Sequence, residues 1–352
     1  MENSKVNANT VFKSRPSVCE VLLYFIIPFL LIAAGAMPST AILILPIVLP
    51  LLYLLYKRFG PYLPLGCIVF YGILSLSLNY DILTVIYFVT LFFAFCGLAV
   101  CVQFLPSQYL LAAAVAACFA VLGAFVGVGI VRGAEGMPIG DIAARYVMNE
   151  RADPVISYFA SDYYDGEKPQ AGEVKLKPTD EGYAEAAAKS LSEWAKDEFD
   201  TYVWYHCIHC GVVLGLVGFF IAAGLNCKIG GRGNSCFSAK IGNMKLPRSF
   251  LWTMAIPATV TGLILGFFDG YGALSATVMH AFCSLPAAFG CYTLLGYFAA
   301  LFKGKARIAA YIIFGLIGVA AVLFPLALFI LSIFGVCDCI LNLRFWTEYI
   351  RN

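Results

Sequence analysis

The acidic residues of this 352-residue chain are concentrated in one segment. Fifteen of its 21 Asp and Glu residues fall within residues 133–200, which contain only seven Lys and Arg residues. This segment, called the acidic module below, carries a formal charge of −8, and the rest of the chain carries +10 because the total is +2. The split predicts a membrane protein with one water-exposed acidic module and with basic loops on the opposite side of the bilayer.

The composition outside the acidic module supports this interpretation. The mean hydropathy is +0.84, and only 12% of the residues are charged, whereas about a quarter would be charged in a soluble protein. The apolar runs approach the roughly 20 residues that a helix needs to cross a bilayer. They lack the alternation of a membrane β-barrel, so helices, which satisfy their own backbone hydrogen bonds, are expected.

The predicted fold is an all-α polytopic transmembrane helical bundle of about ten helices, with eight to ten as the range, and with one extracytoplasmic helical insertion. The segments follow in order: a cytoplasmic N-terminal segment (1–18), five membrane helices (19–131), the acidic insertion (132–201), further membrane helices (202–343) and a cytoplasmic tail (344–352). The last apolar stretch, Ile308–Leu343, is too long for one crossing and predicts a hairpin that breaks at Phe324–Pro325. Counting that stretch as one helix would leave nine.

The Lys and Arg residues set the expected orientation. They gather in the N-terminal segment, at Lys57–Arg58, in the loops 226–250 and 303–307, and in the tail. These parts should be cytoplasmic, and the acidic module should lie outside.

The acidic module is expected to fold rather than to form a disordered tail. Thr179 is a plausible helix N-cap, and an apolar stripe at helical spacing follows it, made of Tyr183, Ala187, Leu191 and Trp194. Neither glycine nor proline occurs between Tyr183 and Cys210. We therefore expect one unbroken helix that runs from the module into the sixth membrane crossing.

Two sets of glycines predict close helix contacts. Gly123 and Gly127 are four residues apart in the fifth apolar run, and Gly262, Gly266 and Gly270 repeat that spacing in the seventh. Small residues at this spacing let a second helix approach closely.

The motifs of common enzyme classes are missing from the sequence. It contains no Walker A motif, no Gly-rich nucleotide fingerprint after a strand and no nucleophile elbow. The apolar runs hold almost no ionisable residue, which argues against a proton pump built on core carboxylates. We expect no enzymatic activity, no cofactor and no nucleic-acid partner, and an ATP-driven process would need its motor on another chain.

One local cluster could contact a ligand. His206, His209 and Cys210 lie three and four residues apart at the start of the sixth membrane helix, so they share one helix face. The predicted topology brings Asp269 and His280 to the same outer membrane boundary. These five residues suit a polar ligand head or a zinc-like ion, although ordinary interfacial packing also explains them. No metal ligand is assigned.

Two short motifs carry a family resemblance. Leu246–Trp252, after the basic loop, resembles the "LPrwfvW" entry of the YybS-like bacterial membrane proteins, and Gly335–Arg344 resembles the "GllDswfDfR" ending of that family, with Asn342 in place of an aspartate. The family has no established activity. It is similar in outline to the substrate-binding membrane subunits of energy-coupling factor vitamin transporters, which implies a multi-pass protein of the bacterial plasma membrane.

Asp338 and Arg344 bracket the end of the last predicted helix. A buried carboxylate needs a partner, which Arg344 or the basic loop around Arg248 could supply. Such a pair would fix the C-terminal helix to the seventh helix, or it would provide a docking site for a cytoplasmic protein.

Two function classes follow from these features. The first is a small-molecule-binding or transport subunit, embedded in the lipid bilayer and acting with partner proteins that include a separate ATPase. The alternative is a non-transporting scaffold or sensor of the cell envelope that uses the acidic module as its contact surface.

Overall fold

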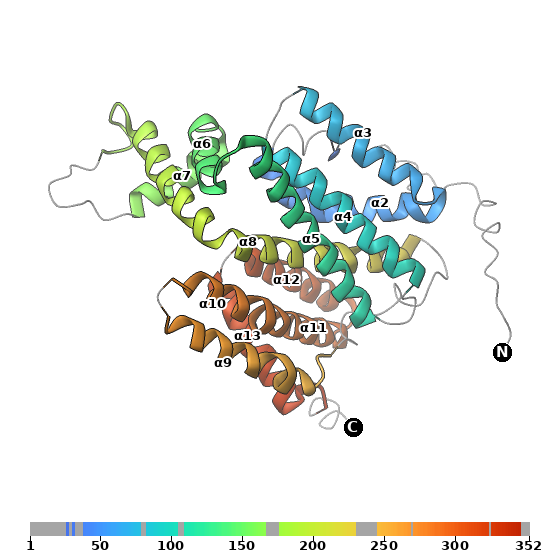
Figure 1. The fold of residues 1–352 in the computed structure, drawn as a ribbon. Coiled ribbons are helices and arrows are strands. Elements are labelled where there is room, and N and C mark those ends of the chain that lie inside the picture. The colour runs from blue at the N-terminus through green and yellow to red at the C-terminus, as the bar shows by residue number, and fades with distance from the viewer. Residues whose placement is uncertain are drawn as a thin grey trace.

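The computed structural model describes residues 26–27, 30–31, 38–78, 82–104, 109–166, 176–229, 245–268, 270–323 and 325–345. Every element in these ranges is a helix, and the ranges contain no strand (Figure 1). The expected all-α architecture is therefore confirmed. Most of residues 19–37, where the five predicted N-terminal membrane helices (19–131) begin, lie outside the described residues.

Four of the helices are long and apolar enough to cross a membrane. They cover Leu83–Cys101, Leu111–Glu135, Tyr183–Ala222 and Gly272–Leu301. Other helices expose large apolar side chains over much of their length, among them Val69, Phe70 and Ile73 on one helix and Ile312, Ile313 and Leu316 on another. Exposed apolar surface of this extent is typical of contact with lipid, and the chain is a membrane protein.

The N-terminal helices form a first group. It consists of α2 (Pro38–Phe59), α3 (Tyr62–Leu78), α4 (Ile82–Phe104) and α5 (Tyr109–Glu135). Their shared core includes Leu52, Leu91, Phe95 and Leu98, none of which is more than 1% exposed. The predicted close contact at the glycines of α5 is confirmed: a Cβ atom at Gly123 would lie 2.8 Å from the Cα of Thr90 on α4.

The described part of the acidic module folds onto a long helix. Here α6 (Ile139–Asn149) and α7 (Pro154–Gly166) pack on the first half of α8 (Tyr183–Ile229). Their small core contains Val147, Ile156, Ala160, Ala187, Leu191 and Ala195. The module is thus a compact helical unit, as its apolar spacing predicted.

Three details of the predicted α8 helix are wrong. The helix begins at Tyr183 rather than after Thr179, because Lys177–Tyr183 forms turns in which the Asp180 carboxylate accepts a hydrogen bond from the Lys177 N–H at 2.8 Å. The helix is also kinked, since Tyr202 has non-helical dihedral angles of φ −116° and ψ 16°. Trp194 is 42% exposed, and Ala195 takes the buried place next to it.

The C-terminal helices form a second group. It consists of η4 (Leu251–Ala255), α9 (Ile256–Gly266), α10 (Gly272–Met279), η5 (His280–Ser284), α11 (Leu285–Leu301), α12 (Gly304–Leu323) and α13 (Pro325–Leu341), where η4 and η5 are single π-helical turns. The last apolar stretch therefore folds as two helices, and the second begins at Pro325 as predicted. Gly262 of α9 faces the Met279 side chain of α10, so α9 and α10 approach closely at this glycine.

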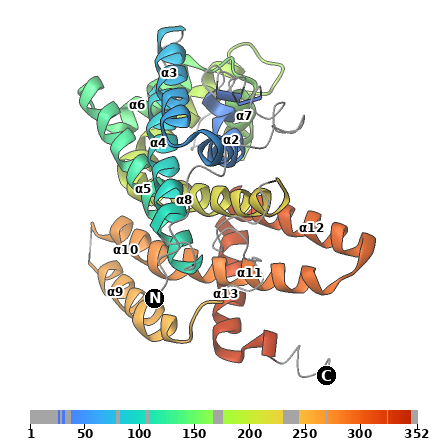
Figure 2. The ribbon, with the colours of Figure 1, turned by 90° about the vertical axis from the view of Figure 1, so that its right-hand side faces the viewer.

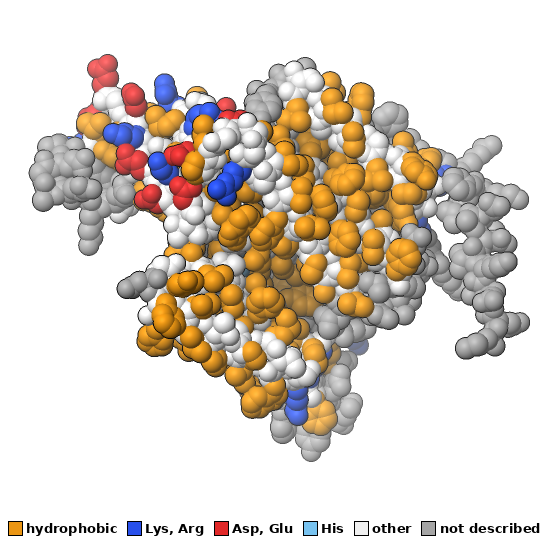
Figure 3. All heavy atoms as spheres, viewed as in Figure 1, with side chains coloured by type: hydrophobic (Ala, Val, Ile, Leu, Met, Phe, Trp, Pro, Cys, Tyr) orange, Lys and Arg blue, Asp and Glu red, His pale blue; other side chains and the backbone are white. Residues whose placement is uncertain are grey.

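The long helix α8 lies between the two groups (Figures 1 and 2). It packs against α2 and α5 on one side and against α10 and η5 on the other. Gly211 and Gly215 make the approach to α5 possible, because a Cβ atom at either position would lie 2.6 Å from a Cα atom of α5. Figure 3 shows the charged side chains gathered over the acidic module and hydrophobic side chains over most of the remaining visible face.

Candidate functional site

Two of the three histidines meet between the long helix and the C-terminal group. His209 Nδ1 on α8 lies 2.9 Å from His280 Nε2, the first residue of η5, although 71 residues separate them in the chain. The two rings are nearly parallel, with an interplanar angle of 28°. His280 is only 5% exposed. The structure thus brings together two of the five predicted residues.

Tyr205 packs against both rings of the pair. Its ring centroid lies 4.2 Å from that of His280 and 6.2 Å from that of His209, to which it is nearly parallel. Tyr205 and His209 are four residues apart on α8, so they project from the same face. The tyrosine thus holds the histidine pair on the side of the helix that faces η5.

His206 takes a different partner from the other two histidines. Its Nε2 atom lies 2.9 Å from Glu198 Oε1, two helical turns back toward the acidic module. Its ring also contacts Tyr205 at 5.5 Å between centroids. Cys210 is exposed, and Asp269 lies outside the described residues. Of the five predicted residues, the structure therefore joins His209 and His280 directly and connects His206 to them through Tyr205.

The histidine pair lies deeper than the sequence suggested. The predicted topology put His280 at the outer membrane boundary. The helix that contains it begins at Gly272 and continues without a break through η5 and α11. Eight residues at 1.5 Å each place His280 about 12 Å along this helix. The pair thus lies within an apolar helix and not at its rim.

The π-helical turn η5 begins at His280. Single π turns widen an α-helix locally and occur frequently at functional sites. This turn is held by its neighbours, because Ser332 Oγ on α13 donates a hydrogen bond to the Ser284 carbonyl at 2.8 Å. Thr259 Oγ1 on α9 also lies 3.8 Å from Cys283 Sγ. The position of His280 is therefore fixed by contacts from three helices.

The geometry of the two rings is that of a hydrogen-bonded pair, because the facing nitrogens are 2.9 Å apart. Among the described residues, no group of three or more His, Cys, Asp or Glu side chains is arranged to hold a metal ion. What the pair offers is one donor and one acceptor in an apolar setting.

Sequence reasoning missed Glu198 and Tyr205. Neither residue was among the five predicted to form the cluster, although Glu198 lies in the acidic module. Helical spacing carried a signal for Tyr205, which precedes His209 by four residues. It carried none for Glu198, which precedes His206 by eight residues. Spacing alone cannot predict which side chains share a face across the kink at Tyr202, because the regular helical rotation is interrupted there.

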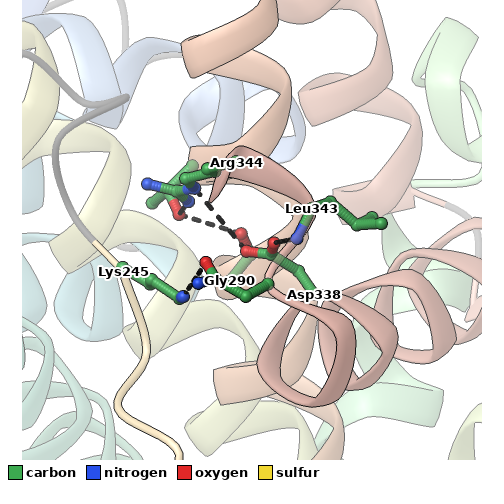
Figure 4. Close-up of polar contacts among 7 residues, drawn as sticks. Lys245, Gly290, Asp338, Leu343 and Arg344 are labelled. Carbon is green, nitrogen blue, oxygen red and sulfur yellow. Dashed lines mark hydrogen bonds and ion pairs between the residues drawn. The ribbon is translucent and has the colours of Figure 1, made fainter. Parts of the chain in front are cut away.

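A second buried polar cluster lies where the chain leaves α13. Arg344 Nε is 3.6 Å from Asp338 Oδ2, and the two residues are 7% and 3% exposed (Figure 4). Arg344 Nη2 donates a hydrogen bond to Thr293 Oγ1 of α11 at 2.8 Å, and its guanidinium lies 5.8 Å from the ring centroid of Tyr297. The predicted partner of Asp338 is therefore Arg344.

The cluster also includes the end of the basic loop, but through a residue other than the predicted one. Lys245 Nζ donates a hydrogen bond to Asn342 Oδ1, whereas Arg248 is exposed. Asn342 has a φ of +52°, a left-handed conformation that asparagine tolerates just after a helix. Through Arg344, the cluster attaches the end of α13 to α11, and not to the predicted seventh membrane helix (η4 and α9).

No protein-family model matches the chain, and no curated protein or solved structure matches it at a significant level. Its function must accordingly be argued from the geometry of these two clusters.

Proposed function

We propose that this membrane protein binds a small polar molecule between α8 and the α10–η5–α11 helix, and that it takes part in transport together with partner chains that hold any ATPase. The observation that carries this proposal is the contact between His209 and His280. The pair joins α8 to the C-terminal group through polar side chains within apolar segments.

The free-energy cost of placing histidines in apolar helices supports a functional role for the pair. A polar side chain inside a membrane helix is expensive, and such residues are functional-site candidates by default. An isolated hydrogen bond between membrane helices contributes only about 0.6 kcal/mol on average, so a simple packing role would be met as well by apolar side chains. The π turn at His280 adds a second feature that is common at functional sites.

The proposal includes a topology. The chain would cross the bilayer about ten times, with both termini in the cytoplasm and with the acidic module outside, as its charge distribution predicts. The membrane would be the bacterial plasma membrane, as the resemblance to the YybS-like proteins implies. The polar molecule would then enter from the side of the acidic module.

A scaffold or sensor is the second candidate, and the attachment of the acidic module favours it. The Gly140 N–H on α6 donates a hydrogen bond to Asp200 Oδ1 on α8 at 2.8 Å, and a Cβ atom at Gly140 would lie 2.2 Å from the Lys196 carbonyl oxygen. Asp141 also pairs with Lys196 at 2.7 Å. Because the module is attached this tightly just before the kink at Tyr202, the binding of a partner to the module would shift α8 as well.

Native mass spectrometry of the detergent-purified protein separates the two candidates. A stoichiometric small molecule that leaves only on activation supports the first. An empty protein that co-purifies with a defined protein partner supports the second and contradicts the first.

A further inference from the structure

Three cations gather at the turn that joins α11 to α12, which lies at the right-hand edge of the molecule in Figure 2. Lys303 lies between the two helices, Lys305 and Arg307 lie in the first turn of α12, and all three side chains are exposed. Residues 270–337 contain no Asp or Glu, so α10, α11 and α12 offer these cations no carboxylate. The ion pairs found within the described ranges do not include them either.

Arg307 is held in place at the end of α11. Its Nε atom donates a hydrogen bond to the Phe302 carbonyl at 2.7 Å, and its Nη2 atom donates one to the Ala300 carbonyl at 3.0 Å. A guanidinium has N–H donors beyond the two used here, and its planar fork suits the oxygens of a phosphate group. Arg307 therefore presents a fixed donor group at the surface of the turn.

An exposed apolar stripe continues from the cations along α12. It consists of Ile308, Ile312 and Leu316, which are 63%, 60% and 64% exposed. These residues follow Lys305 at steps of three and four, so they share its helix face. The stripe spans about 12 Å at 1.5 Å per residue, which approaches the roughly 15 Å hydrocarbon depth of one leaflet. This face of α12 thus has a cationic end and an apolar length that fits an acyl chain.

Helix stability does not account for the cations. The dipole of a helix opposes positive charge at its start, and the first turn of α12 contains no acidic residue that would offset Lys305 and Arg307. Orienting the chain in the membrane requires only the charge. A guanidinium fixed above an apolar stripe is suited, in addition, to a ligand with a negative head and an apolar tail.

We propose that the α11–α12 turn and the apolar stripe of α12 bind an anionic phospholipid such as phosphatidylglycerol. The lipid phosphate contacts Lys303, Lys305 and Arg307, and one acyl chain lies along the stripe. This site is on a different part of the chain from the His209–His280 pair, and it does not depend on the function proposed above.

The test is native mass spectrometry of the full-length protein in detergent, with dioleoyl phosphatidylglycerol or dioleoyl phosphatidylcholine added. These lipids share their acyl chains and differ in the charge of the headgroup, so the wild type should bind phosphatidylglycerol more tightly. The double variant Lys303→Gln/Lys305→Gln should bind it about 30-fold more weakly, which corresponds to about 1 kcal/mol for each lost cation. Arg307 stays in place because it also holds the end of α11.

The matched control is Lys177→Gln/Lys189→Gln, which removes the same charge from two exposed positions of the acidic module. It should bind phosphatidylglycerol as the wild type does, and circular dichroism checks that both double variants are folded. The proposal is overturned if the wild type binds the two lipids equally or if both double variants bind phosphatidylglycerol alike. It is also overturned if glycerol phosphate displaces the lipid at equal concentration, since the site would then recognise a soluble phosphate.

Discussion

Arg344 folds back onto Asp338 and closes the end of the last described helix. The Asp338 carboxylate receives the Leu343 N–H at 3.1 Å through Oδ1 and lies 3.6 Å from the Arg344 guanidinium through Oδ2. Arg344 in turn reaches Thr293 on α11. The pair therefore links the end of α13 to the middle of its neighbour, in a position where both charges are removed from solvent.

Removing one member of this pair should destabilise the protein strongly. Arg344→Ala leaves the buried Asp338 carboxylate without its cation, and breaking a buried pair in this way costs about 3–5 kcal/mol. The matched control is Arg248→Ala, because Arg248 is exposed. Unfolding in detergent, followed by circular dichroism, measures both. Equal stability of the two variants would contradict the described role of the pair.

Gly335 should not tolerate a methyl group. A Cβ atom there would lie 1.7 Å from the Ala287 carbonyl oxygen on α11, so Gly335→Ala must push α13 away. Overpacking of this kind costs about 1–3 kcal/mol. Gly315→Ala on α12 is the matched control, since a Cβ atom at Gly315 meets nothing within 4 Å. The prediction fails if the unfolding midpoints of the two variants shift alike.

The large features of this fold could be predicted because they depend on local patterns. Long apolar runs predict helices wherever the backbone must make its own hydrogen bonds. Pro325 marks the break between α12 and α13. The close contact at Gly123 followed from residue size alone. The start of α8 was harder, because the turn at Asp180 competes with a cap at Thr179 through a side-chain hydrogen bond.

The acidic module should loosen when its attachment to α8 is removed. Asp200→Ala deletes the acceptor of the Gly140 N–H, so the amides at the start of α6 should exchange with deuterium about 5- to 30-fold faster, which corresponds to a loss of about 1–2 kcal/mol. Asp197→Ala on the same helix is the matched control. Hydrogen exchange read by mass spectrometry checks this. Unchanged protection in the Asp200 variant would mean that the apolar contacts of α6 suffice.

The predicted orientation can be tested by labelling. Glu193→Cys lies in the acidic module and Lys305→Cys lies at the start of α12, and both positions are exposed. The background replaces by Ser the exposed cysteines among the described residues, Cys118 and Cys210, and the three cysteines outside them, Cys19, Cys227 and Cys236. A membrane-impermeant thiol reagent added to intact cells should then label residue 193 and not residue 305. The reverse pattern would invert the topology.

The candidate site could be predicted only in part from the sequence. Helical spacing placed His206, His209 and Cys210 on one face. It could not predict which side chain of another helix or turn each of these residues contacts. The kink at Tyr202 turns this face, so His206 reaches Glu198 while His209 reaches His280. The sequence left two possible partners for Asp338, Arg344 and the loop around Arg248. It could not decide between them, because the left-handed turn at Asn342, which directs Arg344 back toward Asp338, is visible only in the structure.

The proposed function places a small polar molecule at the His209–His280 pair. Its most direct test is the amount of the co-purified small molecule, measured by native mass spectrometry, in the wild type, in His280→Asn and in Cys118→Ser. His280→Asn should lose at least about nine-tenths of the bound molecule, since a tenfold loss corresponds to about 1.4 kcal/mol of binding free energy. Cys118→Ser, an exposed change on α5, should retain it. Equal occupancy in all three folded proteins, or none in the wild type, would contradict the claim.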